Sequence, residues 1–193
     1  GTTGAYIGNF VTAGSGGLDV PLGIVFQGGD LYVSSFQTDQ VKRYNGTTGA
    51  FVSNFVAAGS GGLDEPAGIV FGGLANNLYV TNQSNDRVLA YDGTTGAFIG
   101  TFAPTGSGGL DGPRMLSFGP DGRLYIGSRF NNQVMTTAAT LVNEIPTGGD
   151  RSGGRSATVG LDGPNGTLGL TYGCNPGGAI GAPIVHEDLS VKF

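Results

Sequence analysis

Apolar residues recur in short runs along the first part of the chain, and turn-forming residues separate the runs. The first unit has three such runs, at residues 23–26, 31–33 and 41–44. Runs of β-branched and aromatic residues bounded by Gly, Asn and Asp indicate strands. No stretch of useful length shows the 3.6-residue period of an amphipathic helix. The pattern therefore predicts an all-β protein.

The same runs return twice more, and a fourth run completes each set. Equivalent runs lie at 68–71, 78–80 and 88–91, then at 115–118, 124–126 and 134–137. The third run decays in the last copy to Val134-Met135-Thr136-Thr137. The fourth run alternates like an outer strand with one wet face, and it lies at 5–10, 50–55 and 97–102. Asn45-Gly46 and Asp92-Gly93 are expected to form tight hairpin turns with positive φ.

Two phrases mark the repeat unambiguously. GTTGA begins at residues 1, 46 and 93, and GSGGLD occupies 14–19, 59–64 and 106–111. Its Asp recurs after 64 − 19 = 45 and 111 − 64 = 47 residues. Four antiparallel strands in a unit of this length are typical of a β-propeller blade, which buries its faces against its neighbours.

The predicted organisation is three repeats at about 1–45, 46–92 and 93–137, followed by a divergent tail at 138–193. In the tail we expect the outer strand of the third blade at Ala139–Ile145 and a degenerate fourth repeat from Gly160, with an inner strand at Thr167–Tyr172. The chain thus supplies about three and a half blades. A ring seldom closes with fewer than four, so we expect a partial propeller or one completed by other chains. Because the chain begins at Gly1, it is expected to be processed or to be an excerpt of a longer protein.

The stretch LDEPAGIVFGGLANNLYVTNQSNDRVLAYD at 63–92 resembles the NHL repeat, with Pro-x-Gly-Ile, a glycine turn, Leu-Tyr-Val, an Asn-rich loop and Arg-Val. The resemblance extends over residues 1–137, with Arg114 and Met115 departing from it in the third unit. It implies a propeller of the wider group that includes virginiamycin B lyase and the gluconolactonase/regucalcin enzymes. Those enzymes bind metal around a central channel, but none of their functional residues can be matched to a position here. The resemblance therefore implies the fold and no particular activity.

Composition narrows the range of functions. The net charge is −5 with nine scattered basic residues, which disfavours nucleic acid as a partner. No apolar run has the length of a membrane span. The single Cys174 excludes an internal disulfide framework and a cysteine-rich zinc site. Scarce cysteine, together with repeat phrasing that resembles secreted bacterial repeat proteins, predicts an extracellular or cell-surface protein, with the periplasm as the alternative.

Candidate ligand-binding residues lie in the loops between the second and third strands, on the face where propellers usually bind ligands. They are polar or charged, and they are Asp39, Asn82, Asn85, Asp86, Arg129, Asn131 and Asn132.

One acid per repeat precedes a proline in the loop that leads to the next inner strand. These acids are Asp19, Asp64, Asp111 and Asp162. Ca²⁺ prefers oxygen ligands, so these acids are candidates for a Ca²⁺ site, and no other cofactor is expected. The alternative is that each carboxylate caps its own turn by accepting backbone N–H groups, which a feature repeated in every blade favours.

Other catalytic patterns are weak. The only histidine, His186, neighbours Glu187 and Asp188, and a solvated turn explains this triplet better than a metal site. The glycine-rich loops lack the lysine and the helix of a phosphate-binding loop. We therefore expect a non-enzymatic binding or scaffolding module for a protein or glycan. The alternatives are a structural subunit, a homo-oligomer or larger assembly whose open blades form a ring or filament, and a metal-dependent propeller lyase or hydrolase.

Overall fold

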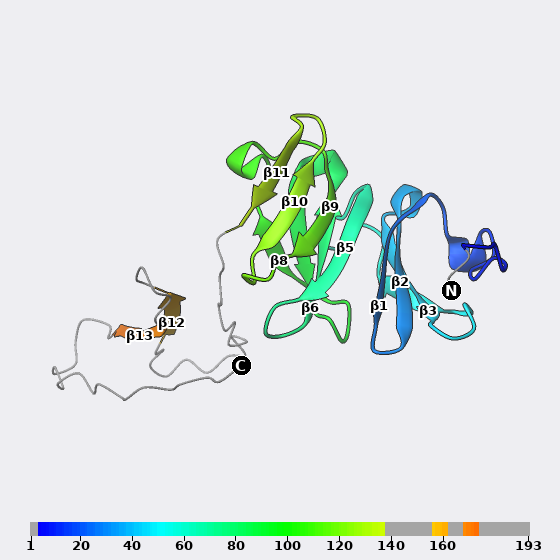
Figure 1. The fold of residues 1–193 in the computed structure, drawn as a ribbon, viewed down its shortest axis with the longest axis horizontal. Helices are drawn as coiled ribbons and strands as arrows, with labels where there is room; N and C mark the ends of the chain where they lie inside the picture. Colours follow the sequence, from blue (N-terminus) through cyan, green and yellow to red (C-terminus); the bar gives the residue numbers. More distant parts are fainter. Residues whose placement is uncertain (1–3, 138–155, 162–167, 174–193) are drawn as a thin grey trace. The chain divides into compact units, whose positions relative to one another are not determined.

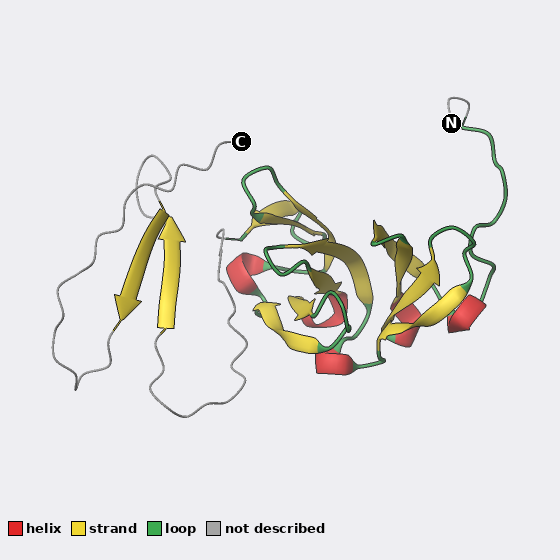
Figure 2. Cartoon of the chain, turned by 90° about the horizontal axis from the view of Figure 1, so that it is seen from below, coloured by secondary structure: helices red, strands yellow, loops and turns green. Residues whose placement is uncertain are grey.

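The computed structural model describes residues 4–137, 156–161 and 168–173, and the chain divides into two units, Gly1–Leu141 and Val142–Phe193. Each unit is described by itself. In the first unit the strands form consecutive antiparallel sheets, which we call blades (Figure 1). The helical elements in the described residues are five three-residue 3₁₀ turns (Figure 2).

The strand order in every blade follows the chain. Blade 1 contains β1 (Pro21–Gln27), β2 (Asp30–Ser35), β3 (Gln40–Asn45) and β4 (Phe51–Val56). Blade 2 contains β5 (Pro66–Gly72), β6 (Asn77–Asn82), β7 (Arg87–Tyr91) and β8 (Phe98–Ala103). Blade 3 contains β9 (Pro113–Phe118), β10 (Leu124–Ser128) and β11 (Gln133–Thr136) in the described residues. The predicted all-β fold with four-stranded antiparallel blades is confirmed.

The inner strands β1, β5 and β9 lie side by side, and the blades pack face to face through them. We call the packing between consecutive blades a joint. Joint 1/2 holds an aromatic cluster of Tyr32, Phe55 and Phe71, with ring centroids 4.8 to 6.3 Å apart. Joint 2/3 repeats it with Tyr79, Phe102 and Phe118. Edge-to-face aromatic pairs stabilise a fold by more than the burial of their apolar surface alone. The packing at the joints therefore explains the repeated apolar pattern.

The N-terminal run at 5–10 is not a strand, so that prediction is wrong. Its equivalents β4 and β8 pair with β3 and β7, whereas no third strand precedes residue 5 among the described residues. Tyr6 and Ile7 are consequently almost fully exposed. The ring of Phe10 nevertheless packs near that of Phe26, with 6.4 Å between the ring centroids, as the ring of Phe55 packs near that of Phe71.

The turns after β3 and β7 are also not the predicted two-residue hairpins. Asn45 and Asp92 each accept the N–H groups of the second and third following residues through Oδ1. The positive φ falls later, at Gly49 and Gly96. The side-chain acceptor stabilises a longer turn than the Asn-Gly and Asp-Gly pairs predicted.

The second unit contains a described hairpin of β12 (Ser156–Leu161) and β13 (Leu168–Gly173), paired antiparallel. β13 agrees with the inner strand predicted at Thr167–Tyr172. Gly160 and Leu161, predicted to begin a fourth repeat loop, lie at the end of β12 instead. The predicted strand at Ala139–Ile145 lies outside the described residues.

Candidate functional site

A buried hydroxyl links the inner strands across each joint. In joint 1/2 the Ser34 Oγ accepts the Gly23 N–H at 2.7 Å and donates to the Ala67 carbonyl of the next blade at 2.6 Å. Thr81 makes the same pair of bonds in joint 2/3, to the Gly68 N–H at 2.7 Å and the Arg114 carbonyl at 3.3 Å. Each hydroxyl is fully buried, and it satisfies a backbone donor and a backbone acceptor that would otherwise be buried without partners.

The hydroxyl bridge requires glycine beside it. A Cβ on Gly23 would overlap the Ala67 carbonyl oxygen, and one on Gly68 would overlap that of Arg114. Blade 3 departs at both positions, with Met115 in place of the glycine and Gly127 in place of the hydroxyl residue. Met115 is accordingly exposed at the far side of blade 3.

The loop aspartates Asp39 and Asp86 form a second link across the joints. Both have left-handed backbone, with φ of 53° and 49°. The Asp39 Oδ1 accepts the Glu65 N–H at 2.9 Å, and the Asp86 Oδ1 accepts the Gly112 N–H at 2.7 Å. These two predicted ligand residues therefore hold blades together, and their accepting oxygens are engaged in doing so.

The structure brings three other predicted residues together in blade 2. The Asn85 Nδ2 lies 3.3 Å from the Asp64 Oδ2 and 3.5 Å from the Asn82 Oδ1. Asn82 is fully buried, and its amide donates to the Gly62 carbonyl at 2.7 Å. The two sets of loops predicted to share a face therefore do contact one another, and most of their polar groups bind each other.

The third blade leaves its loop more open. The Asn131 amide donates to the Gly109 carbonyl at 2.6 Å. Arg129 lies over the exposed ring of Phe130, with 4.9 Å from its guanidinium carbon to the ring centroid. Asn132 is exposed, with a φ of 57°.

The repeated aspartates do not converge. Asp19 and Asp111 are exposed, and their carboxylates form no hydrogen bond within the part of the chain that the structure describes. Their backbones are held instead by the hydroxyls of Ser35 and Ser128. Asp162 and His186 lie outside the described residues, and within the described part of the chain no three His, Cys, Asp or Glu side chains gather as a metal site would require.

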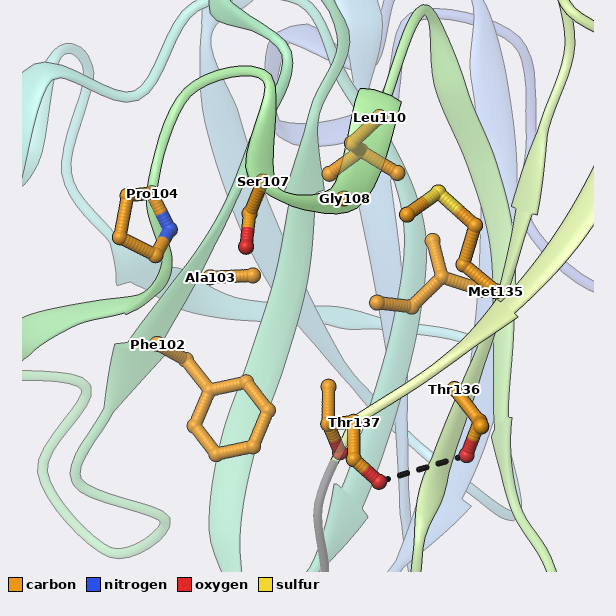
Figure 3. Close-up of a pocket in the computed structure, with 10 residues that line it drawn as sticks. Phe102, Ala103, Pro104, Ser107, Gly108, Leu110, Met135, Thr136 and Thr137 are labelled. Carbon is orange, nitrogen blue, oxygen red and sulfur yellow. Dashed lines mark hydrogen bonds between the residues drawn. The ribbon is translucent and has the colours of Figure 1, made fainter.

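A pocket that the sequence did not predict lies in joint 2/3. Its volume is about 320 Å³, and residues of β8, the loop after it, β10 and β11 line it (Figure 3). Six apolar residues line it together with Gly108, and Ser107, Thr136 and Thr137 add hydroxyls, so polar and apolar atoms contribute about equally to its surface. The six apolar residues are Phe102, Ala103, Pro104, Leu110, Ile126 and Met135.

The equivalent space in the preceding repeats is filled by a tyrosine. By strand register, Thr137 occupies the position of Tyr44 and Tyr91, opposite Leu124 as they are opposite Leu31 and Leu78. Both tyrosines are fully buried, and burial raises the pKa of each phenol. The decay of the third run to Val134-Met135-Thr136-Thr137 is the sequence signal that could have identified this pocket.

No protein-family model matches the chain, and no curated protein sequence matches it. Solved structures do match. Virginiamycin B lyase from Staphylococcus aureus is 17% identical, with a TM-score of 0.49, over 82% of this chain and 42% of that one. Regucalcin, a calcium-binding protein from Agrobacterium tumefaciens, is 21% identical, with a TM-score of 0.44, over 56% and 37%. A putative exported protein from Bacteroides fragilis is 19% identical, with a TM-score of 0.49, over 62% and 33%.

This chain therefore spans about two fifths or less of each of these structures. Virginiamycin B lyase and regucalcin are the proteins whose group the repeat resembles. Among the described residues, no helix has the length and apolar character needed to cross a membrane. The strand order and the repeated joints establish the architecture from the chain itself: it is an all-β protein of propeller-type blades.

Proposed function

We propose that the chain is a non-enzymatic assembly module in which the outer side of blade 1 binds a second copy of the chain. The outer side of blade 1 is the side that carries Ile24 and Phe26. Their side chains are 68% and 60% exposed, whereas the equivalent Ile69 and Phe71 are 6% and 9% exposed inside joint 1/2. An exposed apolar surface that the same protein buries elsewhere supports a contact role.

The chemistry of blade 3 favours pairing between two copies of blade 1. A head-to-tail contact would place blade 3 of one copy against blade 1 of the next, in the manner of a joint. Met115 and Gly127 replace the glycine and the hydroxyl that a joint uses. The outer side of blade 1 can instead meet its own copy across a two-fold axis, where one apolar patch serves both partners.

The test is the mass of the purified chain over a range of concentrations, measured by analytical ultracentrifugation. We expect a dimer that dissociates on dilution, and a monomer for the double variant Ile24→Ser, Phe26→Ser. Ile99→Ser removes a partly exposed apolar side chain of β8 and is the matched control. Because Ile24 and Phe26 are exposed, we expect the double variant to unfold at nearly the same temperature as the unmodified chain, and thermal unfolding is measured on the same samples. A chain that is monomeric at every concentration overturns the proposal.

A second candidate partner is a protein or glycan at the loop face of blade 3. The stacked pair of Arg129 and exposed Phe130 supports it, because aromatic and guanidinium faces provide contact area for such partners. Loss of partner binding on Phe130→Ala, with Tyr6→Ala as an exposed aromatic control, is the expected result. Equal binding by both variants would count against this face.

The competing function is the metal-dependent lyase or hydrolase that the repeat resemblance implies. Turnover of virginiamycin B by the purified chain, lost on chelation and restored by Mg²⁺ or Ca²⁺, would replace the non-enzymatic proposal. We keep Ca²⁺ binding and an extracellular or surface location within the proposal. The metal binding of the enzymes that the repeat resembles supports the first, although Asp19 and Asp111 do not converge on one site, and the single cysteine supports the second.

A further inference from the structure

Each of two successive repeats holds a buried tyrosine in the same setting, which we call the tyrosine slot. In blade 2 the Tyr91 hydroxyl donates to the Ser60 carbonyl at 2.7 Å, and its ring meets Phe98 at 5.7 Å. In blade 1 the Tyr44 hydroxyl donates to the Ser15 carbonyl at 2.8 Å, and its ring meets Phe51 at 5.8 Å. The slot therefore binds a phenol by ring contact and by one backbone acceptor.

The third repeat keeps the acceptor loop of the slot and lacks the tyrosine, and the counterpart of Phe51 and Phe98 lies outside the described residues. Thr137 stands at the tyrosine position, and the pocket of about 320 Å³ occupies the joint there. The loop that carries the acceptor is unchanged. Its Ser107 N–H donates to the Pro104 carbonyl and its Ser107 carbonyl accepts the Leu110 N–H, as the equivalent groups do around Ser15 and Ser60.

The lining matches the chemistry that the tyrosines show. Figure 3 shows Phe102, Leu110 and Met135 around the space, with Ser107 on one side and Thr137 on the other. None of the ten lining residues is charged. A ligand is therefore expected to be uncharged, and a hydroxyl on it could donate a hydrogen bond to the Ser107 carbonyl. Pockets of roughly 300–1,000 Å³ with apolar walls and few polar groups are the usual form of small-molecule sites.

We propose that this pocket binds a small phenol, whose ring takes the place of Tyr44 and Tyr91 and whose hydroxyl donates to the Ser107 carbonyl. The occupant is a free small molecule with the side-chain chemistry of tyrosine. The proposal is independent of the assembly function, because joint 2/3 is remote in the repeat order from the outer side of blade 1.

The probe is p-cresol, which is the tyrosine side chain as a free molecule. The chain has two methionines, and methyl labelling gives each one a resonance. The Met135 methyl lies in the pocket, against Gly108, while Met115 is exposed at the far side of blade 3. We expect p-cresol to move the Met135 resonance in a saturable way through the ring current, and to leave Met115 in place.

Two comparisons test the chemistry. Toluene has the same ring without the hydroxyl, and we expect it to bind about three- to tenfold more weakly, which is the net effect of one hydrogen bond. Thr137→Tyr refills the slot and is expected to weaken p-cresol binding at least about tenfold. Thr101→Tyr adds a tyrosine on the exposed side of β8 and is the matched control, with unchanged binding.

Several outcomes would overturn the proposal. Equal movement of both methionine resonances would mean nonspecific association. Movement of neither resonance would mean that phenols do not enter the pocket. Equal affinity for toluene would remove the role of the Ser107 carbonyl. The toluene and methionine measurements use the unmodified chain, so they decide the matter even if Thr137→Tyr does not fold.

Discussion

Joints 1/2 and 2/3 come from the same repeat, and the difference between them lies at one end. Both keep the aromatic cluster, the buried hydroxyl and the loop aspartate. At the outer end, Tyr91 fills the slot in blade 2, whereas blade 3 has Thr137 and a pocket.

This difference indicates where a repeat protein tolerates sequence divergence. The inner strands of three blades pack in series, so a change there disturbs two blades at once. The outer end of a joint affects only its own slot. A pocket can therefore arise at the outer end while the rest of the joint stays packed. Substitutions that give one blade the residue of another test this difference.

The largest expected effect follows from Tyr91→Thr, which gives blade 2 the residue of blade 3. Removing a fully buried aromatic ring leaves a cavity, and the hydroxyl bond to the Ser60 carbonyl is lost as well. Large-to-small changes of this kind lower the free energy of unfolding by about 3 kcal/mol. Urea denaturation followed by circular dichroism measures it.

The control for this change is Tyr6→Thr, because Tyr6 is exposed and the expected effect is near zero. If p-cresol binds as proposed, Tyr91→Thr also creates a second binding site. An unfolding free energy equal to that of the unmodified chain would mean that the tyrosine slot contributes nothing to joint 1/2.

Gly68→Met gives blade 2 the methionine that blade 3 has at position 115. Its Cβ would overlap the Arg114 carbonyl oxygen, which belongs to backbone and moves only with the strand. Overpacking of this kind costs about 2 kcal/mol, and denaturation measures it. Gly100→Met is the control, because a Cβ there meets no atom within 4 Å. Equal stability of the two variants would contradict the inference that Met115 disfavours a joint on that side of blade 3.

Much of this architecture could be predicted from the sequence, because the strands repeat their pattern of apolar residues. The positions of β1 to β3 and of their copies follow from runs such as Leu31-Tyr32-Val33. Residues 5–10 share the outer-strand pattern but pair with no strand among the described residues. A strand is formed by its partner as well as by its own residues, so the pattern alone predicted wrongly there.

The candidate site was harder to predict. Asp39 and Asp86 have the residue type of ligands, but their bonds to the Glu65 and Gly112 N–H groups depend on how adjacent blades meet. The pocket was in principle visible, because Thr137 breaks a column that holds tyrosine at 44 and 91. A missing side chain indicates a pocket only once the neighbours of the missing group are known.

Ser34→Gly gives blade 1 the residue of blade 3 at position 127. The Gly23 N–H and the Ala67 carbonyl lose the hydroxyl that joins them. We expect a loss of about 1.5 kcal/mol, since buried backbone groups without partners are destabilising and glycine weakens a strand. Ser117→Gly on the exposed face of β9 is the control in the same denaturation series. A loss equal to that of the control would show that the bridge does not stabilise joint 1/2.

The smallest expected effect concerns a turn that differs between blades 1 and 2 by one charge. The Asp92 Oδ1 accepts the Thr95 N–H, the Thr95 hydroxyl and the Thr94 N–H, and Asn45 makes the same three bonds in blade 1. These bonds, that of the Thr95 N–H foremost, lower the pKa of Asp92 from its ordinary 3.8. A carboxylate whose pKa is lower in the folded state stabilises the fold above its unfolded pKa, and it loses that contribution as the pH falls through the folded value.

Asp92→Asn copies Asn45 and removes this titration. Near pH 7 the variant should unfold with nearly the same free energy, because the amide oxygen accepts the same bonds. Below about pH 4 the unmodified chain should lose stability more steeply than the variant. Asp121, whose pKa is lowered chiefly by the Arg123 N–H, titrates in the same direction and remains in both proteins. The difference between the two pH profiles therefore isolates Asp92, and parallel profiles would mean that its turn contributes equally in both protonation states.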